Sequence, residues 1–215
     1  MEREYKWMLA GRPTFDALIG SAMVEQAILG QYEIHMQAIY YDTEDRLVAG
    51  CGGALRLRRE NGTSVCCLKL DEQGQGAWKA RKEYEVRAQD IEGGLAGLAS
   101  MVGKEGAHAL CLSLKGRQLM ETCRTDFVRS ACHLRISMPS GACEGELAFD
   151  FGEMACGARS APLCELEFEH IAGDEQPFHD FAEALAEAFC LMPQPLSKMA
   201  RAMGLSDAAG QWGIA

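Results

Sequence analysis

The sequence lacks any long hydrophobic run. Its longest apolar stretches are far shorter than the roughly 20 residues that span a bilayer, and its charged N-terminus has no apolar run of the kind found in signal peptides. We therefore expect a cytoplasmic protein without a membrane partner. The sequence also has few basic residues: it contains 21 Lys and Arg but 31 Asp and Glu, which gives a net charge of −10. This balance argues against broad binding of nucleic acids.

Cysteine spacings that bind zinc are missing as well. Ten cysteines are present, but no two form a CxxC pair, and Cys66 and Cys67 are simply adjacent. A disulfide framework is not expected without a secretory signal. We therefore expect reduced cysteines that act mostly as small buried hydrophobic residues. The five histidines form no spaced metal motif either.

What the sequence does contain is typical of one α+β domain dominated by antiparallel strands. With 215 residues, 48% of them hydrophobic, the chain can bury a substantial core. Asn61 and Gly62 lie between two alternating runs, which is a strong hairpin signal. We expect helices over 14–29, capped by Thr14, over 177–191 and, more weakly, within 90–120. We expect a loop over 153–162 and a proline-broken tail from 192.

Charged residues recur at alternate positions of the strand-like segments. The opening MEREYKW would place Glu2, Glu4 and Lys6 on one face of a strand, and Arg3, Tyr5 and Trp7 on the other. The same alternation appears in ALRLR (54–58), CCLKL (66–70), ARKEYEVR (80–87), LAFDF (147–151) and CELEFE (164–169). At least six strands therefore have one apolar face and one charged face.

These charged faces could simply face water. Two carboxylates ~7 Å apart on a strand repel by roughly 0.6 kcal/mol in water, but by about 2.5 kcal/mol at an effective dielectric constant near 20. The signs are segregated, however, with cations in the middle of the chain and carboxylates near its ends, whereas a surface adapted for solubility interleaves them. A barrel with its charges inward would have a basic wall suited to phosphate oxygens and an acidic wall suited to a hard divalent metal. Helices would then cover its apolar outer face.

Taken in chain order, the segments resemble the CYTH domains, also called triphosphate tunnel metalloenzymes. Glu2-x-Glu4-x-Lys6 is similar to the ExExK signature of that family. The further matches are YYDTED (40–45), ALRLRRENG (54–62), Lys69, RKEYEV (81–86), TDFVR (125–129), FDFGE (149–153), CELEFE (164–169) and LSKMARAM (196–203). The resemblance covers residues 1–203, leaves 204–215 as a C-terminal tail, and is greatest to the bacterial inorganic triphosphatase branch. It implies an eight-stranded antiparallel β-barrel tunnel with a charged interior and helices packed on the outside.

The resemblance also implies roles for individual residues. The implied metal ligands are Glu2, Glu4, Asp150, Glu165, Glu167 and Glu169, with one or two Mg²⁺ or Mn²⁺ ions as cofactor. The implied phosphate ligands are Lys6, Arg56, Arg58, Lys69, Arg81, Arg129 and Lys198. Lys6, Glu167 and Lys198 are the candidate catalytic residues, and Glu83 and Glu85 are tunnel acids without an assigned role. Arg129 is preferred to Arg124, which falls on the opposite face of a regular strand.

The expected activity is metal-dependent hydrolysis of a linear triphosphate, first of all of tripolyphosphate to pyrophosphate and phosphate. A water on a second metal, Glu167, or a Lys198 of depressed pKa could supply the base. The alternatives are a class IV-type adenylyl cyclase and a thiamine or nucleoside triphosphatase. A thiamine triphosphatase would need an aromatic platform, for which Trp7 and Trp78 are the candidates, but we expect Trp7 to point outward and Trp78 to lie in a glycine-rich loop. A non-catalytic polyphosphate-binding module is a further alternative, although anion binding alone gains nothing from six carboxylates. We expect a small triphosphate as partner, and a monomer or homodimer.

Overall fold

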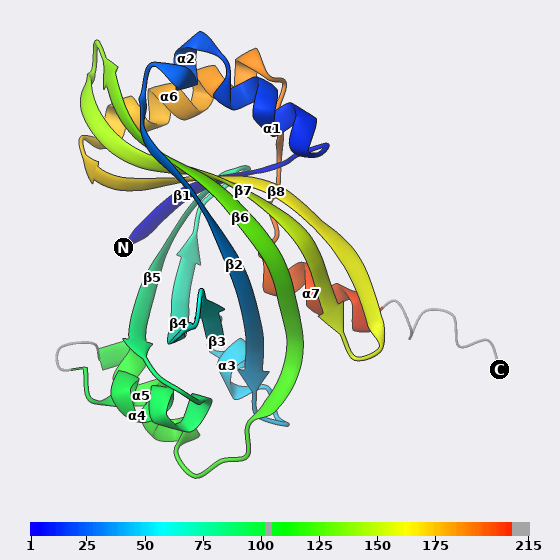
Figure 1. The fold of residues 1–215 in the computed structure, drawn as a ribbon. Coiled ribbons are helices and arrows are strands. Elements are labelled where there is room, and N and C mark those ends of the chain that lie inside the picture. Colours follow the sequence, from blue (N-terminus) through cyan, green and yellow to red (C-terminus); the bar gives the residue numbers. More distant parts are fainter. Residues whose placement is uncertain (102–104, 208–215) are drawn as a thin grey trace.

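The computed structural model describes residues 1–101 and 105–207. In these residues the strands form one antiparallel sheet (Figure 1). The strands are β1 (Glu2–Met8), β2 (Ile28–Asp42), β3 (Ala54–Glu60), β4 (Thr63–Gln73), β5 (Trp78–Arg87), β6 (Met120–Met138), β7 (Gly141–Cys156), β8 (Arg159–Gly173) and the short β9 (Met192–Pro193). The helices are α1 (Arg12–Ile19), α2 (Ala22–Glu25), α3 (Leu47–Gly50), α4 (Ile91–Ala99), α5 (Glu105–Leu114), α6 (Glu175–Ala188) and α7 (Lys198–Asp207).

Eight of these strands close into a barrel. Their order is β5-β4-β3-β2-β6-β7-β8-β1, and β1 pairs again with β5, where Glu2 lies opposite Arg81. The strand β9 adds a short pairing at β1, with Met192 opposite Met8. The predicted eight-stranded antiparallel barrel is therefore confirmed. Closure leaves no open edge between β1 and β5, and it turns one face of every strand toward a common interior.

Two separate hydrophobic cores cover the outer face of the barrel. Under α1, α2 and α6 the core contains Trp7, Phe149 and Phe168, packed against Phe15 and Phe178 of the helices. Under α3, α4 and α5 a second core is built on the outward residues of β3 to β5. Figure 1 shows these two helical groups at opposite ends of the barrel. The apolar face of the alternating strands is thus outside, as the pattern predicts.

The helix α7 packs differently from the others. Its Met199 and Ala202 contact Phe127, Met154 and Leu163, which lie on the inward faces of β6, β7 and β8. The helix therefore covers part of the inner face and brings its first residue, Lys198, to the interior. The predicted domain boundary at residue 203 falls within this helix, and residues 208–215 of the predicted tail lie outside the described residues.

Three local predictions need correction. The expected helix over 14–29 is two short helices, because the chain turns at Gly20 and Ser21, and the Ser21 hydroxyl accepts a hydrogen bond from the Val24 N–H at 3.4 Å. Thr14 lies inside α1, whose N-cap is Gly11.

The segment 153–162 is a hairpin rather than a loop, since β7 continues to Cys156 and β8 begins at Arg159. Gly157, with φ of 58°, supplies the left-handed conformation that the tight turn requires. The predicted helix over 177–191 is α6, which spans Glu175–Ala188, and the predicted proline-broken tail contains a helix, α7, that begins after the prolines. None of the helices in the described ranges is both long and apolar enough to cross a bilayer.

Gly152 in β7 is required by a close approach of β6. A Cβ atom there would lie 2.2 Å from the Asp126 carbonyl oxygen and 2.5 Å from the Cα of Phe127. We expect Gly152→Ala to lower the free energy of unfolding by about 1–3 kcal/mol, because the β6 backbone would have to move. Urea denaturation measures this loss. Gly30→Ala in β2, where an added Cβ meets nothing within 4 Å, is the matched control, and equal losses in both variants would contradict the packing argument.

Candidate active site

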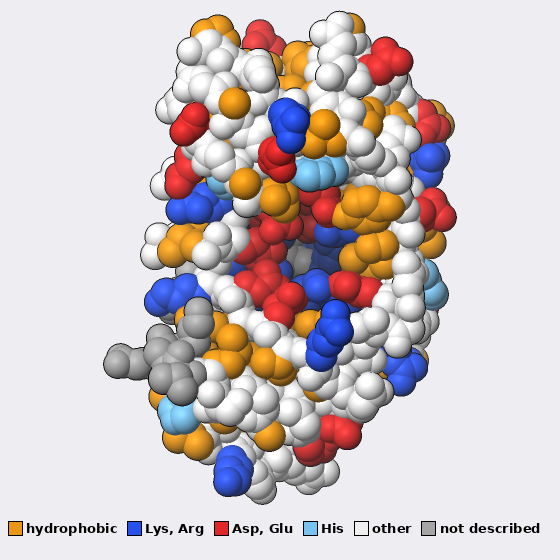
Figure 2. Space-filling view, turned by 60° about the vertical axis from the view of Figure 1, so that its left-hand side comes forward, with side chains coloured by type: hydrophobic (Ala, Val, Ile, Leu, Met, Phe, Trp, Pro, Cys, Tyr) orange, Lys and Arg blue, Asp and Glu red, His pale blue; other side chains and the backbone are white. Residues whose placement is uncertain are grey.

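The barrel interior contains a cavity of about 540 Å³. Figure 2 looks into its opening, where acidic and basic side chains lie deep inside and hydrophobic side chains lie along one side. Charged residues from β1, β3, β4, β5, β6, β7 and β8 and from α7 line the cavity. They are Glu2, Glu4, Lys6, Arg56, Arg58, Glu60, Lys69, Arg81, Glu83, Glu85, Arg129, Glu146, Glu167, Glu169 and Lys198.

The first cluster of charges lies where β1 meets β5. The Glu2 carboxylate accepts hydrogen bonds from Lys69 Nζ at 3.0 Å and from Arg81 Nε at 2.7 Å. Glu4 accepts one from Arg81 Nη2 at 2.5 Å and lies 3.3 Å from Lys6 Nζ. The side chains of Glu4 and Lys6 are only 2–3% exposed. The ExExK motif thus places two carboxylates and one ammonium group in the interior, each beside a charge of opposite sign.

The second cluster joins β3, β4 and β5. Glu83 lies 3.3 Å from Arg56 Nη2 and 3.0 Å from Lys69 Nζ, and Arg58 Nη2 lies 3.2 Å from Glu85. Burial alone would raise the pKa of Glu83, but Lys69 and Arg56 outweigh it and lower the pKa to about 2. Glu83 is therefore ionised, and it neutralises the two cations that lie nearest to it.

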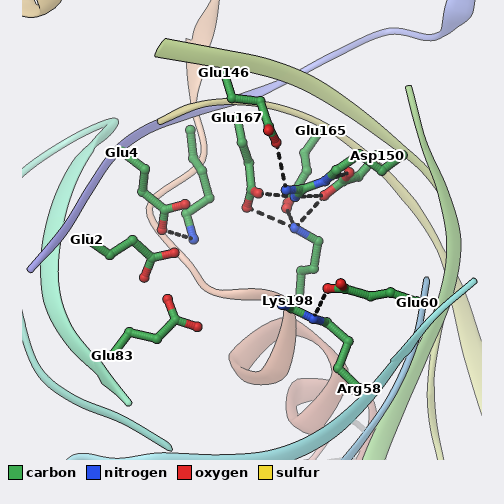
Figure 3. A network of polar contacts seen from close by, with 12 residues as sticks. Glu2, Glu4, Arg58, Glu60, Glu83, Glu146, Asp150, Glu165, Glu167 and Lys198 are labelled. Carbon is green, nitrogen blue, oxygen red and sulfur yellow. Dashed lines mark hydrogen bonds and ion pairs between the residues drawn. The ribbon is translucent and has the colours of Figure 1, made fainter. Parts of the chain in front are cut away.

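The third cluster surrounds the first residue of α7. Lys198 Nζ lies 2.8 Å from Asp150 Oδ2 and 2.8 Å from Glu167 Oε1, and it also forms an ion pair with Glu165 (Figure 3). Arg129 Nε lies 2.7 Å from Asp150 Oδ1, and its Nη2 contacts Glu167. Burial would raise the pKa of Glu167, but Lys198 and Arg129 hold it well below its ordinary value. Burial does raise the pKa of Glu165, which lies beside two other carboxylates.

The environment of Lys198 bears on its predicted use as a base. Burial lowers the pKa of Lys198, but Asp150, Glu165 and Glu167 more than compensate and raise it above the ordinary value. The depressed pKa that a lysine base requires is therefore absent, and the side chain is an ammonium group that donates hydrogen bonds. A catalytic role of Lys198 stays a prediction, and stabilisation of negative charge fits its environment better than proton abstraction.

Glu169 differs from the other interior acids. Among the described residues, its carboxylate has no cation within ion-pair distance, and its strand neighbours in register are Glu4 on β1 and Glu146 on β7. Burial, followed by the charges of Glu2 and Glu4, raises the pKa of Glu169 to about 8. A carboxylate without a cation of its own, beside further carboxylates, supplies the oxygen ligands that a hard divalent metal prefers.

The structure brings most of the predicted site residues to the cavity wall, although it does not test their roles. Asp150 and Glu165 are the exceptions, because they are fully buried behind the wall and contact Arg129, Lys198 and Arg201. The predicted separation into a basic and an acidic wall is also incomplete. Arg129 and Lys198 lie among the carboxylates, and acids lie among the cations of β3 to β5, because an enclosed carboxylate needs a cation nearby.

Sequence analysis missed several residues of the site. Arg201 contacts Glu165, and Glu146 lies 3.5 Å from Arg129 Nη1. A signal for each was present, since Arg201 follows Lys198 by one helical turn and Glu146 precedes Asp150 on the same strand face. Tyr32 also lines the cavity, whereas Trp7 and Trp78 do not. Trp7 is 2% exposed in the outer core, so neither tryptophan provides the aromatic platform considered from the sequence.

A closed antiparallel barrel whose interior is lined by interleaved carboxylates and cations defines the tunnel type of β-barrel protein. The chain belongs to the CYTH domain family, whose model matches residues 1–203. It is 26% identical over 185 residues to the inorganic triphosphatase of Haemophilus influenzae. That match covers 86% of this chain but 50% of the relative, so the chain spans about half the length of the curated relative that it matches.

Solved structures share the fold. The Hippeastrum adenylyl cyclase-like protein HpAC1, described as having a dominant triphosphatase activity, matches with a TM-score of 0.58 and 16% identity over 95% of this chain and 96% of that one. The PH1819 protein of Pyrococcus horikoshii matches with a TM-score of 0.57 and 16% identity over 95% and 99% of the two chains. At these identities the likeness establishes the fold alone.

Proposed function

We propose that this protein hydrolyses inorganic tripolyphosphate to pyrophosphate and phosphate in the presence of Mg²⁺ or Mn²⁺. The observation that carries the proposal is Glu169, a half-buried carboxylate with no ion-pair partner in the described part of the chain, which lines a cavity that also holds arginines and lysines. The similarity to the inorganic triphosphatase of Haemophilus influenzae, which covers half of that protein, supports the same reaction.

The basic side chains of the cavity would bind the substrate. Arg56, Arg58, Lys69 and Arg81 project from β3, β4 and β5, and Lys6 projects from the adjacent β1. Guanidinium groups bind phosphate oxygens in a bidentate manner, and ammonium groups act as compact point charges. A linear triphosphate lying along this wall would meet a cation at each phosphate. Held in this way, the scissile phosphoanhydride is oriented for attack by water.

The acidic side chains fit a divalent cation. Glu2, Glu4 and Glu169 would hold it, since Glu169 lies opposite Glu4 in the β1–β8 pairing and Glu2 is the next inward residue of β1. When bound, a divalent cation polarises phosphoryl oxygens and lowers the pKa of water. A pure anion-binding protein would gain nothing from these acids, so their presence favours catalysis over binding alone.

Three residues near α7 would act on the charge that develops in the reaction. Lys198 and Arg129 are positioned by Asp150 and Glu167, so that both cations face the cavity from the acidic side. Negative charge on the transferred phosphoryl group would be stabilised by these preorganised donors. Glu167 is held ionised and could accept a proton from the attacking water. The cytoplasmic location and the monomeric or homodimeric state stay predictions from the sequence.

Product analysis tests the proposed function directly. Purified protein would be incubated with Mg²⁺ or Mn²⁺ and, in parallel, with tripolyphosphate, ATP and thiamine triphosphate. Fast release of phosphate from tripolyphosphate, with EDTA abolishing it, is the expected result. Formation of cyclic AMP from ATP would overturn the proposal in favour of a cyclase, and binding of triphosphates without turnover would overturn it in favour of a binding module.

Replacement of Arg56 tests the phosphate wall. The Arg56 side chain is 13% exposed and faces the cavity, so it would contact phosphate in the ground state and more strongly in the transition state, where negative charge develops on the phosphoryl oxygens. We expect Arg56→Ala to raise KM and lower kcat together, with kcat/KM reduced about 100-fold. Steady-state kinetics with tripolyphosphate measures the change. Arg59→Ala, an exposed arginine of the same strand, is the control, and an unchanged kcat/KM in Arg56→Ala would remove Arg56 from the wall.

A further inference from the structure

Of the aromatic side chains that line the cavity in the described part of the chain, Tyr32 is the most exposed. Tyr40 and Phe127 are 5% and 6% exposed and belong to the core under α7. Tyr32 is 40% exposed. It lies on β2 four residues before Met36. Met36 pairs with Glu60, the last residue of β3, so β3 ends before it reaches the level of Tyr32. Its ring therefore stands at the open end of the cavity, and Figure 2 shows hydrophobic side chains along one side of this opening.

The ring of Tyr32 is held in place by its hydroxyl group. The hydroxyl donates a short hydrogen bond to Glu146 Oε2 on β7. Burial and this bond raise the pKa of Tyr32, so the phenol stays protonated and remains a donor. Glu146 in turn lies 3.5 Å from Arg129 Nη1. The contact ties the tip of the side chain to β7, two strands along the sheet from β2, while the side chain as a whole stays 40% exposed.

The position of Tyr32 along the barrel matches the end of a bound triphosphate. Ile34 lies opposite Arg129 in the β2–β6 register, and Tyr32 is the next inward residue of β2. The two inward positions are about 7 Å apart along the strand. A nucleoside triphosphate that binds with its α-phosphate at Arg129, the reverse of the orientation in which its terminal phosphoryl group would be transferred there, would bring its organic end to the level of the Tyr32 ring, with the half-buried Ile34 below it. In this orientation it would compete with the inorganic substrate.

We propose that Tyr32 forms an aryl subsite, on which the base of a nucleoside triphosphate stacks while its phosphates occupy the charged cavity. This inference rests on the proposed binding of triphosphates in the cavity and extends it to a second class of ligand. Stacking of a base on an aromatic side chain makes removal of that side chain cost about tenfold in affinity. A ligand without a ring, such as tripolyphosphate, gains nothing from the subsite. Tyr32 thus sets how well organic triphosphates compete with the inorganic one.

Equilibrium binding tests the subsite without requiring turnover. Calorimetry with Mn²⁺ would compare β,γ-imidoadenosine triphosphate with imidotriphosphate, two compounds that resist hydrolysis. We expect Tyr32→Ala to weaken the adenosine compound about tenfold and imidotriphosphate less than twofold. Tyr32→Phe keeps the ring and should retain both affinities within twofold. Phe151→Ala removes an aromatic ring that is 56% exposed on the outer face of β7, and it should change neither affinity.

Other results would overturn the proposal. If Tyr32→Ala and Tyr32→Phe weaken both compounds equally, the hydroxyl group acts by positioning Glu146 and Arg129. If Tyr32→Ala changes neither affinity, or if the wild-type protein does not bind the adenosine compound, there is no aryl subsite. Since binding is the measured quantity, a protein that binds both compounds but fails to hydrolyse tripolyphosphate would refute the proposed function and leave the subsite standing.

Discussion

Replacement of Glu4 by glutamine is expected to lower metal-dependent turnover at least 100-fold while the barrel remains folded. Glutamine keeps the shape of the side chain but removes the negative charge that a hard divalent cation requires. Mutations of outer-shell partners of metal ligands already cost 10–100-fold in affinity or activity, so loss of a direct ligand should cost more. Titration of activity with Mn²⁺, together with calorimetry of Mn²⁺ binding, measures the effect.

The controls for this variant separate metal binding from folding. Glu153→Gln changes an exposed carboxylate on the outer face of β7 and should leave turnover and Mn²⁺ affinity unchanged. Thermal denaturation of Glu4→Gln should stay cooperative, because the amide oxygen can still accept from Arg81 Nη2, which lies 2.5 Å from the carboxylate. Normal turnover and normal Mn²⁺ affinity in Glu4→Gln would refute the assignment of this residue to the metal.

Removal of the Lys198 charge is expected to be the most destabilising single change in the interior. Asp150 and Glu165 are fully buried, and both contact the Lys198 ammonium group. Removal of the cation from a buried ion pair leaves the carboxylate charge uncompensated, which costs about 3–5 kcal/mol. We expect Lys198→Met to lower the free energy of unfolding at neutral pH by this amount and to abolish turnover. Chemical denaturation followed by circular dichroism measures the stability.

A second substitution makes the origin of this loss testable. Asp150→Asn added to Lys198→Met should recover part of the stability, because it removes one of the charges left without a partner. Lowering the pH should also reduce the loss, since burial already raises the pKa of Glu165 and its protonation removes one of the charges left without a partner. Arg124→Met, at a cation on the outer face of β6 whose side chain is 59% exposed, should change stability by about 0.5 kcal/mol or less. Equal effects in Lys198→Met and Arg124→Met would contradict the buried network.

The barrel was predictable because most of its strands carry charged residues on one face and apolar residues on the other. Alternation in segments such as 2–7 and 164–169 fixes which residues share a face, and the outer cores around Phe168 and Leu68 follow from it. Helix boundaries were predicted less well. The break at Gly20 depends on one glycine and one capping serine, and the turn at Gly157 depends on one backbone conformation. Such local features carry a weak signal in an alternating sequence.

The membership of the site was largely predictable, but its internal pairing was not. Strand alternation shows that Glu167 and Arg129 face inward, yet it does not show which cation each carboxylate meets. That depends on strand register and on the packing of α7, which brings Lys198 to Glu167 of β8 from 31 residues further along the chain, and to Asp150 of β7. Tyr32 was missed for a similar reason, because β2 carries no charged alternation to mark its inward face.

The pairing of charges in the interior has a consequence for the way in which ligands enter. Glu2 and Glu4, which would hold a cation, are occupied by Lys69 and Arg81, which would hold phosphate. Binding of either ligand must therefore exchange ion pairs, and the exchange frees the groups that the other ligand needs. The two proposed binding equilibria would thus be coupled, and each ligand would lower the dissociation constant of the other by the same factor. The charged interior is largely a self-neutralised network of ion pairs, and under the proposed function it would respond to the cation and the polyphosphate as a pair.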